Sequence, residues 1–232
     1  MEESIHSGHR QRVKNEFLQN GFNAKTPQHK VLELLLFYCI PRGDTNTLAH
    51  ELINKYKTIA GVLDAPVEEL IKFNGLTTNN IVLLKLILPI ARMYTSDKQE
   101  CISKFNNLSE VGDFLLGRYI GLSEEYFSVL SMDGTGRFIS FDFVEHGDLG
   151  SVGVSTRKLI QLILNTQASC VVVAHNHPSG IALPSAADCS ITENIANALS
   201  HIGVHLIDHI VVADNDYVSM AQSQKYKYIF EN

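Results

Sequence analysis

Two short stretches decide how the second half of this chain folds: residues 170–180 read CVVVAHNHPSG, and residues 184–188 read PSAAD. A continuous apolar run such as 170–174 is expected for a strand that is buried on both faces. The run ends at His175, and the proline and glycine that follow predict a sharp turn. A serine followed three residues later by an acid is typical of a helix N-terminus, so we expect a helix to begin at Ser185.

Two histidines stand two residues apart at the end of this strand. In extended backbone, side chains at i and i+2 point to the same face, so both imidazoles can reach one ion. Two imidazoles and a carboxylate suit Zn²⁺, and three protein ligands leave a fourth position for water, as hydrolysis requires. The sequence therefore predicts a zinc site formed by His175, His177 and Asp188. A capping box of Ser185 and Asp188 is the purely structural alternative, and the two interpretations are compatible.

The pattern of the whole chain predicts two domains. The first ninety residues show helical periodicity, whereas strands and helices alternate beyond residue 106, as in an α/β or α+β fold. Residues 95–106 are polar and aperiodic. We therefore expect a helical domain, a linker, a sheet-containing domain and a tail, at 1–94, 95–106, 107–223 and 224–232. In the sheet-containing domain, strands are expected at 126–132, 138–144, 169–174, 205–213 and 217–220, and helices at 109–119, 155–166 and 185–200.

The spacing of the candidate ligands also resembles a known family motif. His-x-His, seven residues, Ser, two residues and Asp match the JAMM (MPN-type) zinc metalloprotease motif at every defined position. The flanking sequence resembles the bacterial RadC-like branch in four segments: VAHNHPSG at 173–180, LIDHIVV at 206–212, GHRQR at 8–12 and LELLLFYCIPR at 32–42. The resemblance covers nearly the whole chain. It implies an all-helical, helix-hairpin-helix-like N-terminal domain, a C-terminal MPN/JAB-type mixed sheet flanked by helices, and a zinc-dependent hydrolase of peptide or isopeptide bonds.

The same resemblance implies two catalytic residues. JAMM enzymes place a glutamate general base on an upstream strand and use the motif serine to stabilise the tetrahedral intermediate. The segment EYFSVL at 125–130 resembles the start of that strand, which assigns Glu125 as the base and Ser185 as the oxyanion helper. Glu124 would point to the opposite face of a strand, and Glu145 and Asp142 on the next strand are poorer candidates.

Other interpretations of these residues fit less well. His205 and His209 have the i,i+4 spacing of a helical zinc pair, but the alternating HLIDHIVVA predicts a strand. Asp208 and His209 could still lie close to the metal. A zinc nucleobase deaminase would need H-x-E and P-C-x-x-C, which the chain lacks. A cysteine protease using Cys170 or Cys189 would need a reactive thiol, and buried thiols are usually inert.

The N-terminal domain raises nucleic-acid binding as the alternative function. Residues 71–85 resemble a helix-hairpin-helix, which binds nucleic-acid backbones through amides at a helix N-terminus. However, Thr77 stands where the family hairpin usually has a second glycine, and the net charge is −6. The nearby charges are balanced, two lysines against two glutamates: Lys72, Lys85, Glu68 and Glu69. The basic stretch 9–14 is a second possible phosphate contact. DNA binding in repair, with a structural or vestigial metal site, is therefore the alternative hypothesis.

The composition of the chain also indicates the cellular compartment in which we expect the protein. The apolar runs are too short or too interrupted to cross a bilayer, and the polar N-terminus shows no secretion signal. The four cysteines are scattered and contain no C-x-x-C pair, which argues against a disulfide framework. We expect a cytoplasmic protein with a peptide or protein substrate and no membrane partner.

Overall fold

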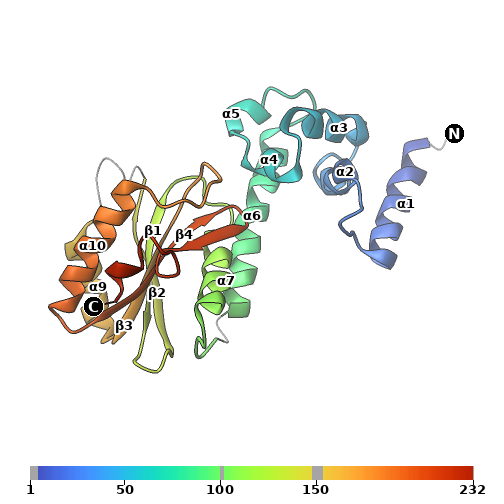
Figure 1. Ribbon diagram of the computed structural model, residues 1–232. Helices are drawn as coiled ribbons and strands as arrows, with labels where there is room; N and C mark the ends of the chain where they lie inside the picture. Colours follow the sequence, from blue (N-terminus) through green and yellow to red (C-terminus); the bar gives the residue numbers. More distant parts are fainter. Residues whose placement is uncertain (1–4, 100–101, 148–153, 232) are drawn as a thin grey trace. The chain divides into compact units, whose positions relative to one another are not determined.

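The computed structural model describes residues 5–99, 102–147 and 154–231, and the chain divides into two compact units, Met1–Ile90 and Ala91–Asn232. The first unit is helical (Figure 1). It contains α1 (Ile5–Asn20), α2 (Gln28–Cys39), α3 (Thr45–Tyr56), α4 (Ile59–Asp64), α5 (Val67–Leu70) and the first turns of α6 (Thr78–Gln99). Its core is a cluster of buried leucines, among them Leu32, Leu36, Leu52, Leu70 and Leu84.

Local signals explain where three of these helices begin or end. Gly21 adopts a left-handed conformation (φ 64°) and its N–H donates to the Phe17 carbonyl, which ends α1. The Asp44 side chain caps α3. Helix α4 has only six residues, too few to show an amphipathic period in the sequence, and Thr58 caps it by accepting the Gly61 N–H.

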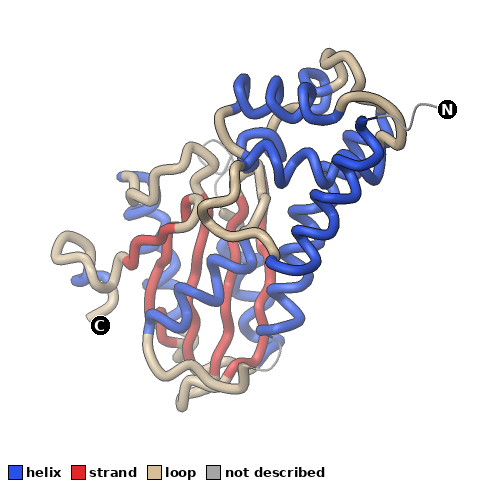
Figure 2. The backbone as a smooth tube through the Cα atoms, turned by 90° about the vertical axis from the view of Figure 1, so that its right-hand side faces the viewer, coloured by secondary structure: helices blue, strands red, loops and turns tan. Residues whose placement is uncertain are grey.

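The second unit is built on a five-stranded mixed sheet, seen with its strands in red in Figure 2. Its strands are β1 (Tyr126–Met132), β2 (Phe138–His146), β3 (Cys170–Asn176), β4 (His205–Ala213) and β5 (Asp216–Ser219). Their order is β2-β1-β3-β4-β5, in which β3 and β4 are parallel and the other neighbours are antiparallel. The expected mixed sheet flanked by helices is thus confirmed.

Helices cover both faces of this sheet. Helix α7 (Leu108–Tyr119) packs on one face, and α9 (Thr156–Thr166) and α10 (Ala186–Ser200) pack on the other (Figure 1). Because side chains alternate between the two faces of a strand and both faces are covered here, residues 170–174 of β3 are all apolar. Val172 and Ala174 pack against α7, whereas Val171 and Val173 pack beneath α9 and α10. The central strands therefore contribute to two cores.

The segment expected as a linker differs in the structure, because α6 remains helical as far as Gln99. Contacts with other parts of the second unit keep these residues helical, although their polar composition predicts a linker. Arg92 Nη1 donates to the Ile120 carbonyl at 2.9 Å, and the Arg118 guanidinium bonds to Ser96, so α7 supports these last turns.

The expected tail also has structure. A short 3-10 helix, η1 (Lys227–Ile229), follows β5, and Tyr226 and Ile229 are buried in a small cluster beside α10. Across the described residues, no helix is both long enough and apolar enough to cross a membrane.

Candidate metal centre and cavity

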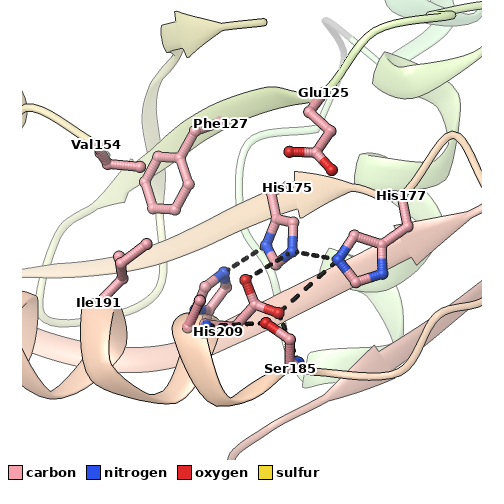
Figure 3. Close-up of a pocket in the computed structure, with 10 residues that line it drawn as sticks. Glu125, Phe127, Val154, His175, His177, Ser185, Ile191 and His209 are labelled. Carbon is pink, nitrogen blue, oxygen red and sulfur yellow. Dashed lines mark hydrogen bonds and ion pairs between the residues drawn. The ribbon is translucent and has the colours of Figure 1, made fainter. Parts of the chain in front are cut away.

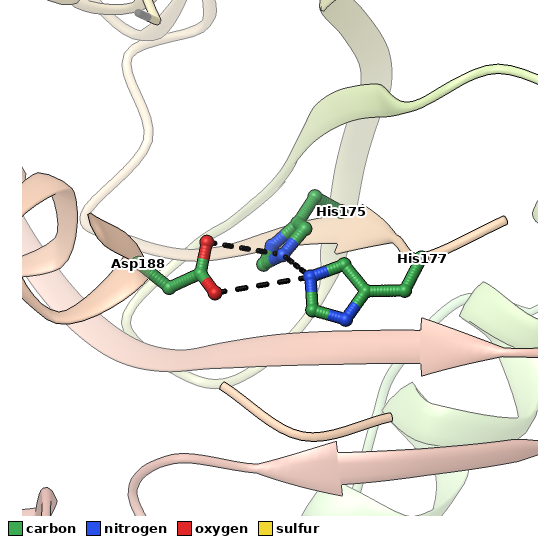
Figure 4. Close-up of side chains that lie close together, drawn as sticks. All are labelled: His175, His177 and Asp188. Carbon is green, nitrogen blue, oxygen red and sulfur yellow. Dashed lines mark hydrogen bonds and ion pairs between the residues drawn. The ribbon is translucent and has the colours of Figure 1, made fainter. Parts of the chain in front are cut away.

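Three side chains that could hold a metal ion converge at the end of β3 (Figure 4). His175 Nε2 lies 2.9 Å from His177 Nε2 and 3.2 Å from Asp188 Oδ1, and His177 Nε2 lies 3.8 Å from Asp188 Oδ2. The three side chains are 4%, 18% and 13% exposed, in that order. The structure thus brings together the three residues expected as ligands, in a place that is shielded yet reachable from solvent.

The two histidines reach the same side because the strand pairing continues past β3. The His177 N–H donates to the Val212 carbonyl at 2.8 Å, so the backbone is still extended there. The chain then turns at Gly180, which has φ 80° and donates its N–H to the His177 carbonyl. Residues with a side chain rarely adopt this left-handed φ, and a Cβ here would also approach Asp214 Oδ2 to 2.9 Å.

The third side chain comes from the first turn of α10. Ser185 is its N-cap: Ser185 Oγ accepts the Asp188 N–H at 3.2 Å, and Asp188 Oδ2 accepts the Ser185 N–H at 2.6 Å. This is the expected capping box, and it leaves Asp188 Oδ1 facing His175. One carboxylate therefore both caps the helix and reaches the histidines.

Burial sets the protonation of this cluster. It lowers the pKa of His175 to about 4, so the ring is neutral at pH 7. Burial alone would raise the pKa of Asp188, but the interaction with His175 and the hydrogen bonds from Ser185 outweigh it, and the pKa lies below the ordinary value. A neutral imidazole and an ionised carboxylate are the forms in which these groups bind metals.

A cavity of about 220 Å³ opens beside the cluster (Figure 3). Phe127, Val154 and Ile191 form its apolar wall. Glu125 lines the opposite side, and its carboxylate points toward the two histidines. Its neighbour Glu124 is exposed, with Oε2 3.6 Å from His146 Nδ1. Of the two adjacent glutamates, Glu125 is the one that faces the cavity.

Asn176, between the two histidines, holds the backbone on both sides of Glu125. Asn176 Oδ1 accepts the Tyr126 N–H at 2.8 Å, and Asn176 Nδ2 donates to the Glu124 carbonyl at 2.9 Å. The β1–β3 pairing ends at Phe127, opposite His175, so the side-chain amide extends the ladder by one step. The contact of Asn176 with β1 depends on strand pairing, which no local pattern reveals.

Behind His175 lies His209, whose position depends on a β-bulge. The pairing of β3 with β4 moves from Val171↔Leu206 to Val172↔Asp208, which skips one residue of β4. His209 consequently stands opposite Val173, and its Nε2 lies 2.8 Å from His175 Nδ1. The suggestion that His209 lies close to the metal site therefore agrees with the structure.

The Asp208 side chain supports this strand instead of facing the cavity. Its carboxylate accepts hydrogen bonds from Ser219 Oγ and from the backbone N–H groups of His209 and Ala221. Burial raises its pKa to about 6, although these hydrogen bonds favour the charged form.

Thr192 is a further member of the site that the sequence did not indicate. It is fully buried in α10, one helical turn after Asp188, and its hydroxyl donates to the Asp188 carbonyl at 2.5 Å. The only available signal was its i+4 spacing from Asp188, which is common in helices.

The remaining candidates lie elsewhere. His205 pairs with Cys170, at the opposite end of β3 from His175. Burial raises the pKa of the Cys170 thiol, which disfavours a reactive thiolate. On β2, Glu145 lies 3.8 Å from Lys158 Nζ, and Asp142 accepts a hydrogen bond from Ser140. Among the described residues, Cys39, Cys170 and Cys189 are free thiols.

In the first unit, the hairpin-like link is stabilised by contacts within the protein. Thr77 N–H and Oγ1 both donate to Asn80 Oδ1, which caps the start of α6. Lys85, one of the two lysines considered for phosphate contact, donates from Nζ to the Leu63 carbonyl. That ammonium group is therefore already engaged by the C-terminal end of α4.

Comparisons with known proteins agree with this architecture. Residues 105–226 match the family described as RadC-like JAB domain, and this range includes all five strands of the sheet and every residue that lines the cavity. A UPF0758 protein of Fusobacterium nucleatum is 34% identical over 96% of this chain and 98% of its own length. A UPF0758 protein of Pseudoalteromonas translucida is 32% identical over 91% of this chain and 94% of its own length. Another, of Shewanella baltica, is 35% identical over 90% of this chain and 92% of its own length.

Proposed function

The chain belongs to the RadC-like JAB-domain family, as its motifs suggested, and on that premise we propose that it is a zinc-dependent hydrolase of peptide or isopeptide bonds. The observation that carries the proposal is the convergence of His175, His177 and Asp188 beside a cavity that Glu125 also lines. An open cavity with three metal-ligating groups and one further carboxylate is the arrangement that metal-assisted hydrolysis needs.

The donor set fits zinc. A tetrahedral zinc ion with bonds of about 2.1 Å separates its donor atoms by roughly 3.4 Å. His175 Nε2 lies 2.9 Å from His177 Nε2 and 3.2 Å from Asp188 Oδ1, both close to that value, and one ligand atom from each residue lies within 4.8 Å of the others. His177 Nδ1 lies 2.9 Å from the Ile181 carbonyl, which can only accept, so Nδ1 is the donor of this hydrogen bond and Nε2 is the ring nitrogen that faces the cluster.

Zinc held there would supply Lewis acidity that lowers the pKa of water toward neutrality and polarises the amide carbonyl. Glu125 would then accept a proton from the attacking water and pass it to the leaving nitrogen. Ser185 Oγ accepts the Asp188 N–H with one lone pair, so its hydrogen is left to donate to the developing oxyanion. Asn176 would keep Glu125 in place for the proton transfer.

The test separates zinc binding from catalysis. We expect the purified protein to bind one zinc ion and to cleave members of a panel of fluorogenic peptides and lysine-linked isopeptides. Glu125→Gln should retain zinc but lose about 10²- to 10⁴-fold in turnover, because a general base contributes on that scale. Glu124→Gln is the matched control and should behave as wild type. Full turnover by Glu125→Gln would refute the assignment of the base, and a protein that takes up no zinc would end the proposal.

A further inference from the structure

Hydrogen bonds beneath the cavity join two of the candidate ligands through two residues behind them. His175 Nδ1 lies 2.8 Å from His209 Nε2, and His209 Nδ1 lies 2.6 Å from Thr192 Oγ1. The Thr192 hydroxyl donates to the Asp188 backbone carbonyl at 2.5 Å. His175, His209 and Thr192 are 3%, 1% and 0% exposed. This chain of hydrogen bonds is therefore shielded from solvent, and it connects the His175 ring with the backbone of Asp188.

The chemistry of these groups fixes the direction of each hydrogen bond. A carbonyl oxygen can only accept, so the single hydroxyl hydrogen of Thr192 goes to Asp188. Met220 Sδ, 3.7 Å away, is a much weaker acceptor. The Thr192 oxygen must then accept from His209, which places the proton of the neutral His209 ring on Nδ1.

The same logic extends to the ligand itself. With its proton on Nδ1, His209 offers only a lone pair at Nε2, so it must accept from His175 Nδ1–H. A neutral His175 ring then has its remaining lone pair on Nε2, the nitrogen that faces His177 and Asp188. The tautomer that metal ligation requires thus follows from the protein's own hydrogen bonds.

We propose that Thr192 and His209 are positioning residues that hold His175 in its Nδ1–H tautomer, through a relay that begins at the Asp188 backbone carbonyl. The relay also links β3, β4 and α10, so the orientation of His175 depends on the register of α10 against the sheet. This inference rests on the metal site of the proposed function, but it needs no catalytic step.

One experiment reads the tautomers directly. In the ¹⁵N-labelled full-length protein, treated with chelator at neutral pH, long-range ¹H–¹⁵N correlation spectra show which ring nitrogen carries the proton. We expect the proton on Nδ1 in both His175 and His209. A wild-type spectrum with the His209 proton on Nε2 would overturn the proposal, and this result requires no variant to fold.

A second experiment measures what the relay does for metal affinity. Thr192→Val keeps the shape of the side chain but removes the hydroxyl, and zinc affinity, measured by competition with a chelator, should fall roughly 10- to 100-fold, as for other residues that support metal ligands. Thr192→Ser should restore binding to within a few-fold of wild type. Thr95→Val is the matched control, because Thr95 Oγ1 also donates to the carbonyl four residues earlier in a helix, away from the site.

The outcomes separate the two proposals. Wild-type affinity in Thr192→Val would overturn the relay while leaving the hydrolase intact. A wild-type protein that binds no zinc would remove the proposed function, whereas the nitrogen spectra would still decide the relay.

Discussion

Replacing Asp208 by asparagine should change how the stability of the protein depends on pH. The Asp208 carboxyl is fully buried, and three donors satisfy it: Ser219 Oγ and the N–H groups of His209 and Ala221. Asparagine has the same shape and can keep the two backbone N–H groups on its carbonyl oxygen, while its NH₂ faces the Ser219 oxygen. The variant therefore removes a titrating group without opening a cavity.

The sign and size of the effect follow from the raised pKa. Burial raises the pKa of Asp208 from 3.8 to about 6, so the folded protein holds this proton more tightly than the unfolded chain. The stability from this group is fully present below pH 3.8 and is lost as the pH rises through 6. The full difference corresponds to roughly 3 kcal/mol, and the part that falls between about pH 4.5 and about pH 7.5 is roughly 2 kcal/mol.

Urea unfolding of chelated wild type and Asp208→Asn, measured across this range, tests the reasoning. The free energy of unfolding of wild type minus that of the variant should fall by about 2 kcal/mol as the pH rises. Asp113→Asn, at an exposed position of α7, measures the effect of removing one surface carboxylate and is subtracted. A difference that stays constant or grows with pH would show that Asp208 is already ionised in the fold at the low end of the range.

Three further predictions concern the cavity and the first unit. Asn176→Asp should lower the free energy of unfolding by about 1–3 kcal/mol, because the Glu124 carbonyl loses its donor. Its kcat should fall by a larger factor than its KM rises, and Asn194→Asp, at an exposed position, is the control. Zinc at 100 times its Kd should stabilise the protein by about 2.7 kcal/mol, seen as a rise of Tm of roughly 10 °C, and Asp188→Asn should abolish most of that rise. Fluorescence anisotropy with single- and double-stranded DNA should show weak binding or none at low salt, because the Lys85 ammonium group already donates to the Leu63 carbonyl. Tight binding that weakens steeply with salt would instead favour DNA binding as the function.

The strands, and the meeting of His175, His177 and Asp188, could be predicted from the sequence because both depend on short-range spacing. Apolar runs gave β1, β3 and β4 to within two residues, and the cap at Ser185 placed the start of α10. The i, i+2 spacing of His175 and His177 predicted their shared face, because alternation is a local property of a strand.

What the sequence could not predict depends on contacts between segments that lie far apart in the chain. The bulge that turns His209 toward His175 arises from the pairing of β4 with β3, and an isolated strand carries no mark of it. The contact of Asn176 with the backbone beside Glu125 spans 50 residues or more. Helix α6 continues to Gln99 because α7 packs against it, although its last residues are polar.

The site is organised so that each candidate ligand is oriented by a different part of the fold. The Ile181 carbonyl in the turn fixes His177, the relay from α10 through β4 fixes His175, and the cap at Ser185 fixes Asp188. Because these bonds form when the protein folds, an arriving ion would meet donors that already face one another and would lose little free energy in ordering them. A substitution that loosens α10 against β4 should therefore weaken metal binding even if it touches none of the three ligands.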